Sequence, residues 1–160
     1  ERFISSISQT LEGDKNLFVI CAGGGKFSIQ DLENFSSLNI TNQVKQFNLD
    51  DDILANLYQN AQLFVFPSLY EGFGIPVLEA FACECPLVCS ETSSLSEVGG
   101  DAAYYFDPYN EESIRNAVEE VLKNSELQNE LRQKGTKRLE QFSWEQTAIK
   151  TKKVYESILR

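Results

Sequence analysis

The 160-residue sequence contains no histidine and no methionine, and it has a single tryptophan. Without histidine, the chain supplies no imidazole base and no imidazole metal ligand. Its apolar runs fall short of the roughly 18 residues that a membrane-spanning helix needs. Basic residues are scarce as well, because 14 lysines and arginines stand against 24 aspartates and glutamates, a net charge of −10. This charge disfavours nucleic acid and anionic membrane surfaces as general partners.

The four cysteines, Cys21, Cys83, Cys85 and Cys89, allow two interpretations. The C-x-C spacing is compatible with metal binding, but a tetrahedral zinc site usually needs four well-placed sulfur or nitrogen ligands. All four cysteines stand in apolar contexts, where a free cysteine behaves as a small hydrophobic residue. We therefore expect no metal site, and thiols kept reduced in the cytoplasm.

Apolar runs alternate with amphipathic ones along most of the chain. Short continuous apolar runs alternating with helical patterns predict an α/β fold: a doubly wound, Rossmann-like parallel sheet with helices on both faces. The composition and length fit one domain with a substantial core. The predicted strands are 17–22, 43–47, 63–67, 86–90 and 103–106, and the predicted helices are 28–38, 50–60, one from about Pro76, 94–98, and a helical C-terminal tail of 110–124, 126–140 and 144–159.

The segment LFVFPSLYEGFGIPVLEAFACECP, residues 63–86, contains the chemically suggestive residues. Proline is favoured at the first position of a helix, so Pro76 predicts a helix start after the third strand. The free amides of that start, near Val77 and Leu78, form an anion site. Gly72 and Gly74 would let the preceding backbone approach a ligand closely.

Glu79 is the one charged residue in the apolar run 75–83, and a buried carboxylate without a partner costs several kcal/mol. It must therefore have a partner. Two interpretations stay open at this point: an ion pair or helix-start hydrogen bond within the protein, or hydrogen bonds from the diol of a bound ligand. Glu71, in the glycine-rich loop, could accept further ligand hydroxyls.

At these residues the chain resembles the retaining glycosyltransferases of family 4, which have the GT-B fold and an E-x₇-E signature. The resemblance rests on FVFPSLYEGFGIPVLEAFACECPLV and continues through SSLSEVGGDAAYYFDPYNEESI to FSWEQTA, so it covers essentially the whole chain. It implies that residues 1–160 are the C-terminal, nucleotide-sugar-binding domain of such an enzyme. The N-terminal acceptor domain and the first strand region would be absent from this chain, which the lack of an initial methionine also suggests.

The resemblance also implies residue roles. Glu71 would be the catalytic-site carboxylate that holds hydroxyls of the transferred sugar, and Glu79 would hold the ribose hydroxyls. The backbone amides of Phe73, Gly74 and Ile75 would face the sugar, and those near Val77 and Leu78 would face the diphosphate. The donor-binding set is Glu79, Gly72, Phe73, Gly74, Ile75, Val77 and Leu78, and the residues expected near the base are Val44, Lys45, Gln46 and Phe47.

The implied activity is transfer of a hexose from a nucleotide-sugar to a glycan or lipid-linked acceptor, in cell-surface polysaccharide synthesis, with no metal or other cofactor. The implied partners are the nucleotide-sugar, the N-terminal domain and the acceptor. The implied location is the cytoplasm, with peripheral contact to the inner membrane face through the N-terminal domain. This fragment alone is expected to be inactive. The alternatives are a non-catalytic nucleotide-sugar-binding module, or another GT-B enzyme such as an epimerase or a phosphorylase.

Four places in the sequence depart from the family pattern or allow a second interpretation. Family members carry an arginine and a lysine just upstream of the helix that here begins near Arg2, and neither Arg2 nor Lys26 replaces them. Glu84 stands where members often have glycine, at a position suited to a left-handed helix cap. The run from Gly23 to Lys26 lacks the P-loop spacing and is interpreted as a strand-end turn. Glu97 could lie near the active cleft or on a helix surface.

Overall fold

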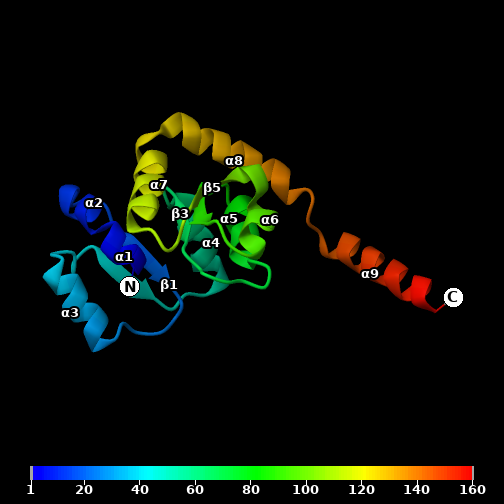
Figure 1. Ribbon diagram of the computed structural model, residues 1–160, viewed down its shortest axis with the longest axis horizontal. Helices are drawn as coiled ribbons and strands as arrows, with labels where there is room; N and C mark the ends of the chain where they lie inside the picture. The colour runs from blue at the N-terminus through cyan, green and yellow to red at the C-terminus, as the bar shows by residue number, and fades with distance from the viewer. Residues whose placement is uncertain (1, 160) are drawn as a thin grey trace.

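The computed structural model describes residues 2–159 and has the predicted α/β architecture (Figure 1). All strand pairs are parallel, and helices cover both faces. The strands are β1 (Val19–Ala22), β2 (Val44–Phe47), β3 (Phe64–Phe66), β4 (Leu87–Ser90) and β5 (Ala103–Phe106). The helices are α1 (Arg2–Ser6), α2 (Ser8–Gly13), α3 (Ile29–Ser37), α4 (Asp51–Asn60), α5 (Ile75–Ala82), α6 (Ser94–Gly99), the 3₁₀ turn η1 (Gly100–Ala102), α7 (Glu111–Lys123), α8 (Ser125–Leu139) and α9 (Trp144–Ile158).

The strands form two hydrogen-bonded groups, β1–β2 and β3–β4–β5, whereas the sequence predicted one continuous sheet. The difference shows in burial. The central strand β4 is buried at all four positions, but β1 alternates between half-buried and exposed. Phe18 and Ile20 are 53% and 39% exposed, although the apolar run around them is typical of a central strand.

Two clusters of apolar side chains lie on opposite faces of β4. On one face, Val88 packs with Phe106 and with helices α1 and α7. On the other face, Leu87 and Cys89 pack with α5 and α6. The first cluster also includes side chains of β1, β2 and β3, so the two groups of strands share one core.

Side-chain caps begin several of the helices, as the sequence suggested. Asp50 accepts a hydrogen bond from the Ile53 amide at the start of α4, at 2.9 Å. Ser143, immediately before the last helix, accepts one from the Gln146 amide at 3.0 Å. Such caps satisfy amides that the first turn of a helix leaves unpaired, which explains why these boundaries were predicted within one or two residues.

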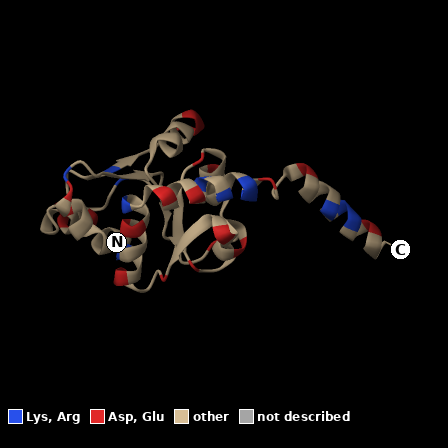
Figure 2. Ribbon diagram, turned by 90° about the horizontal axis from the view of Figure 1, so that it is seen from above, with Lys and Arg blue, Asp and Glu red and all other residues tan. Residues whose placement is uncertain are grey.

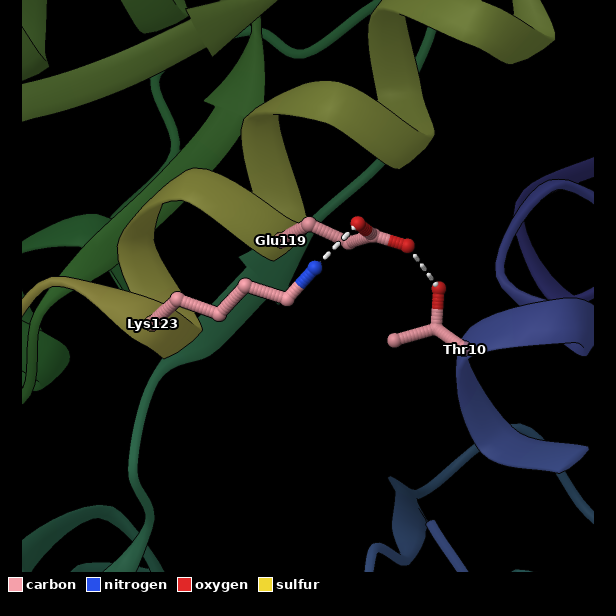
Figure 3. A network of polar contacts seen from close by, with 3 residues as sticks. All are labelled: Thr10, Glu119 and Lys123. Atoms are coloured by element: carbon pink, nitrogen blue, oxygen red, sulfur yellow. Dashed lines mark hydrogen bonds and ion pairs between the residues drawn. The ribbon is translucent and has the colours of Figure 1, made fainter. Parts of the chain in front are cut away.

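A polar network joins the N-terminal helices to α7 (Figure 3). Thr10 of α2 donates a hydrogen bond to Glu119 Oε1 at 2.7 Å, and the Lys123 ammonium lies 2.5 Å from Glu119 Oε2. Hydrogen bonds from Lys123 and Thr10 lower the pKa of Glu119. The network therefore fixes α2 against the helix that covers one face of the sheet.

Helix α9 extends away from the rest of the chain and buries none of its side chains (Figure 1). Basic residues gather along α8 and α9, whereas acidic residues are spread over the rest of the ribbon as well (Figure 2). Residues 132–160 hold eight of the 14 basic residues and only three of the 24 acidic ones. Within the described residues, no helix is both long enough and apolar enough to span a bilayer.

Candidate functional site

The loop between β3 and α5 carries Glu71 and is held in place from α6. The hydroxyls of Ser93 and Ser94 donate hydrogen bonds to the backbone carbonyl of Glu71, at 2.7 and 2.9 Å. The Glu71 carboxylate accepts a hydrogen bond from Ser68 at 2.7 Å and is half-buried. Glu71 is thus placed at the carboxyl end of β3, which is where ligands bind in open α/β sheets.

The two glycines of this loop differ in what the fold requires of them. Gly74, the residue before α5, has φ = +96°, and a Cβ there would lie 2.8 Å from Leu95 Cδ2. Glycine is required at this position because φ is positive and because a Cβ would be too close to Leu95. Gly72 has no such requirement, because nothing lies within 4 Å of a Cβ placed there. The open space beside Gly72 would fit the approach of a ligand to the backbone.

The start of α5 offers fewer free amides than the sequence suggested. The Val77 amide donates to the Gly74 carbonyl at 3.0 Å, and the Val77 side chain is fully buried. The sequence suggested that this amide would be free, but it already has a partner within the protein. Within residues 2–159, no hydrogen bond donated by the amides of Phe73, Gly74 or Ile75 is found. These three amides therefore have no partner within the described residues, although Gly74 is buried whereas Phe73 and Ile75 are exposed. The donor-binding roles of these amides and of the Leu78 amide stay predictions.

Glu79 has one partner within the protein, Tyr58, which is neither the ion pair nor the helix-start hydrogen bond that the sequence suggested. The Tyr58 hydroxyl of α4 donates to Glu79 Oε2 at 3.3 Å. Burial and the nearby carboxylate raise the pKa of Tyr58. Glu79 itself is half-buried, and among the described residues no hydrogen bond to its Oε1 is found. This oxygen remains able to accept a ligand hydroxyl.

Tyr58 lies within the predicted helix 50–60 but was not among the predicted site residues. A buried tyrosine hydroxyl usually finds a hydrogen-bond partner, and that was the signal available. The sequence could not identify the partner, because the contact depends on how α4 packs against α5.

The segment expected near the base is divided between core and surface. Val44 is 4% exposed and belongs to the core, so its side chain does not reach the surface. Contact with the base stays a prediction for Lys45, Gln46 and Phe47. Lys45 and Phe47 are exposed, and Gln46 donates to the Gly23 carbonyl at 3.0 Å. Phe47 pairs with Ala22, which places the end of β2 beside the glycine turn after β1.

Glycines 23, 24 and 25 all have positive φ, and helix α3 begins only at Ile29, behind a Ser28 cap. The run therefore forms a turn at the end of β1 and does not lead directly into a helix, as a P-loop would. Glu97 is exposed on α6, where its carbonyl accepts a hydrogen bond from Arg138.

Glu84 has φ = +54°, the left-handed conformation for which glycine is preferred. The Cys85 amide donates to the Ala80 carbonyl and the Glu84 amide to the Phe81 carbonyl, which together form a Schellman cap. The left-handed cap at the end of α5 therefore forms even though a glutamate occupies the position where family members often have glycine. Its cost is a non-glycine residue with positive φ.

All four cysteines are free thiols, and burial raises the pKa of each. Cys85 and Cys89 reach about 12, and both are buried in the apolar clusters. They pack as small hydrophobic residues, as predicted. No group of three or more potential metal ligands occurs within the described part of the chain.

Two hollows on the surface lie away from the Glu71 loop. One of about 360 Å³ is lined by Gln59, Cys83 and Arg132, at the end of α5 remote from the loop. Another of about 490 Å³ lies around Thr10 and Glu119. Neither of these two hollows is lined by a residue of the segment 71–79.

A parallel α/β domain with a tethered loop, free amides and two carboxylates at its carboxyl edge has the layout of one domain of the GT-B fold. The family Glycosyl transferases group 1 matches residues 1–138. The chain therefore belongs to the glycosyl transferases group 1 family.

Similar proteins include mannosyltransferases. The chain is 40% identical over 105 residues to O-antigen chain mannosyltransferase B of Escherichia coli, a match covering 66% of this chain and 28% of that protein. It is 34% identical over 115 residues to the MMP alpha-(1->4)-mannosyltransferase of Mycolicibacterium hassiacum, covering 69% and 28%. The matched region thus spans little more than a quarter of these relatives.

Solved structures show the same fold. A glycosyltransferase from Rickettsia africae aligns with a TM-score of 0.84 at 18% identity, covering 99% of this chain and 44% of that one. Sucrose-phosphate synthase from Thermosynechococcus elongatus aligns with a TM-score of 0.82 at 22% identity, covering 99% and 42%. These likenesses support the GT-B fold assignment.

Proposed function

We propose that this chain is the donor-binding domain of a retaining glycosyltransferase, and that the full-length protein transfers mannose from a nucleotide-sugar to a glycan or lipid-linked acceptor in cell-surface polysaccharide synthesis. The observation that carries this proposal is the arrangement at the β3–α5 loop. Tethered Glu71, the three free amides and the half-buried Glu79 follow one another at the carboxyl edge of the sheet. The choice of mannose rests on the names of the relatives.

In this proposal the amides of Phe73, Gly74 and Ile75 hold the donor at the positive end of α5. Glu71 accepts hydroxyls of the transferred sugar, and Glu79 accepts a ribose hydroxyl through Oε1 while Tyr58 holds its other oxygen. Both carboxylates face sugars, because they would repel the diphosphate. The helix start stabilises the charge that develops on the departing diphosphate.

Positive charge for the diphosphate must come from elsewhere in the protein. Residues 1–131 hold 21 acidic and six basic residues, and Lys45 is the one basic residue among the candidates. Arg2 is engaged otherwise, since it donates to the Pro108 carbonyl at 3.1 Å and lies 5.6 Å from the Tyr109 ring centroid. We assign the charge to residues upstream of α1, as in the family, and no metal is required for it.

The domain proposal draws on the divided sheet. The Val19 amide bonds to the Gln43 carbonyl and the Phe64 amide to the Pro86 carbonyl, at 2.8 Å each. Backbone groups alternate in direction along a strand, so those of Ile20 point away from β2, and those of Val65 point away from β4. A further parallel strand, preceding α1 in the full-length protein, would fit between β1 and β3 and complete one sheet.

Helix α9 supports the same division into domains. Trp144, Tyr155 and Ile158 are 82%, 64% and 74% exposed and recur at the spacing of a helix-packing face. Exposed apolar faces of this kind mark interaction surfaces. We propose that the N-terminal domain, which holds the acceptor at the cytoplasmic side of the membrane, covers this face. This chain alone would then bind donor weakly and transfer nothing.

Variants of the two glutamates in the full-length protein test the proposal. Glu79→Gln should weaken binding of a nucleoside diphosphate by ~1–3 kcal/mol, the scale of hydrogen bonds to charged groups. Glu71→Ala should lower sugar transfer while the nucleoside diphosphate still binds. Calorimetry and a panel of nucleotide-sugars would measure both effects. Unchanged affinity in a folded Glu79→Gln protein would reject the ribose role, and equal loss of binding and transfer in Glu71→Ala would reject the sugar role.

A further inference from the structure

The loop between β3 and α5, called the donor loop below, is held by other residues on both sides of Phe73. Within the described residues, the backbone of Phe73 itself has no such contact. Upstream, Ser93 and Ser94 hold the Glu71 carbonyl. Downstream, Gly74 is buried and its carbonyl accepts a hydrogen bond from the Val77 amide at 3.0 Å. Phe73 lies between these points, and its side chain is 43% exposed. Burial alone therefore does little to define its conformation.

The ring of Phe73 meets a second aromatic ring from a distant part of the chain. Its centroid is 6.0 Å from that of Phe142, and the planes stand at 80°, an edge-to-face pair. Phe142 lies in the short connection between α8 and α9 and is half-buried against the cluster on the α5 and α6 face. The pair of Phe73 and Phe142 therefore joins the α8–α9 connection to the donor loop.

Phe142 is itself held by Arg138 at the end of α8. The Arg138 guanidinium lies 5.3 Å from the centroid of the Phe142 ring. It also donates to the Val98 carbonyl at 3.1 Å and to the Glu97 carbonyl, at the C-terminal end of α6. Helix α6 therefore contributes to both parts of the arrangement. Ser93 and Ser94 at its start hold the donor loop, and the carbonyls at its end hold Arg138, which supports Phe142.

We propose that Phe142 is a positioning residue for the donor loop: its edge-to-face contact fixes Phe73, and with it the direction of the Phe73 and Gly74 amides. This inference rests on the proposed function, because it assigns those amides to the donor. Phe142 would not touch the donor. Since Phe142 precedes α9 directly, the position of α9 would act on the loop through this contact.

The test compares three variants. Phe142→Leu keeps an apolar side chain but removes the ring, Phe142→Tyr keeps the ring, and Leu139→Ala is the matched control. Leu139 packs against the same cluster from α8. In the 160-residue chain, the ¹⁵N order parameters of Phe73 and Gly74 should fall in Phe142→Leu, from about 0.85 toward 0.6 or below. They should return to the starting value in Phe142→Tyr and stay unchanged in Leu139→Ala.

In the full-length enzyme, Phe142→Leu should raise the KM for the nucleotide-sugar about two- to tenfold, the factor that corresponds to the energy of an aromatic pair. Phe142→Tyr should restore KM, and kcat should change less than KM. Unchanged order parameters in Phe142→Leu, or an equal fall in Leu139→Ala, would show that the edge-to-face contact does not fix Phe73. The proposed function would not be affected by either result. A looser loop with unchanged KM in an active enzyme would overturn the positioning role, because the loop would then not hold the donor.

Discussion

Replacing Gly74 by alanine tests whether the loop conformation is fixed in the way described. Gly74 precedes α5 with φ = +96°, where an L-residue is strained. An added Cβ would lie 2.8 Å from Leu95 Cδ2, closer than real Cβ contacts come. Leu95 is fully buried, so moving its side chain would disturb the packing of its neighbours in the core. Both effects therefore act against the folded state.

The two effects can be given rough sizes. A non-glycine residue held in a sparsely populated conformation costs about 1–3 kcal/mol. Overpacking a well-filled core by one methyl group costs a further ~1–3 kcal/mol. Together we expect Gly74→Ala to lower the free energy of unfolding by roughly 2–6 kcal/mol. For a domain of this size that corresponds to a fall in Tm of about 4–24 °C.

Gly72→Ala is the matched control, because a Cβ there meets nothing within 4 Å. Its unfolding free energy should stay within about 0.5 kcal/mol of the starting protein. Chemical and thermal denaturation followed by circular dichroism would measure both variants. If Gly74→Ala is no less stable than Gly72→Ala, the assigned backbone conformation before α5 is wrong. If Gly72→Ala also leaves donor binding unchanged, the open space at Gly72 is not used by the donor.

Three further predictions concern single side chains. Glu84→Gly should stabilise the domain by ~0.5–1 kcal/mol, because glycine relieves the positive φ of the α5 cap at the cost of a more flexible unfolded chain; a loss of stability on denaturant unfolding would contradict the cap. Tyr58→Phe should weaken nucleoside diphosphate binding in the full-length protein about two- to fivefold, because Glu79 loses the hydroxyl that orients it, and calorimetry showing full affinity would remove Tyr58 from the site. Glu119 has a lowered pKa, so its contribution to stability is complete above its ordinary pKa near 4.5 and is lost as the pH falls through the lowered value. Glu119→Gln should therefore flatten the acid side of the stability–pH profile, and an unchanged profile would show that the pair with Lys123 adds nothing.

The order of the elements and most of their boundaries could be predicted from the sequence, because local signals determine them. The apolar runs around Val19, Phe64 and Leu87 became strands, and Asp50 and Ser143 became caps. The division of the strands into two groups could not be predicted in this way. It depends on which strands pair, and the apolar run around Ile20 is typical of a strand with neighbours on both sides.

At the candidate site, the sequence indicated the chemistry but not the contacts. The isolated carboxylate of Glu79 predicted a partner, and Tyr58 supplies it from another helix. The bonded amide of Val77 could not be foreseen, because it depends on the left-handed conformation of Gly74. The pairing of aromatic rings between the loop and the α8–α9 connection is likewise a product of tertiary packing.

The most direct measurement is an NMR titration of the ¹⁵N-labelled chain with a nucleoside diphosphate and with the corresponding nucleotide-mannose. Binding should be weak, in the millimolar range or about −4 kcal/mol. Both ligands should shift the Glu79 amide, and the sugar-bearing ligand should add larger shifts at Phe73, Gly74 and Ile75. Shifts confined to the hollow around Arg132, or no shift within residues 71–79 for either ligand, would contradict the assignment of the β3–α5 loop as the donor site.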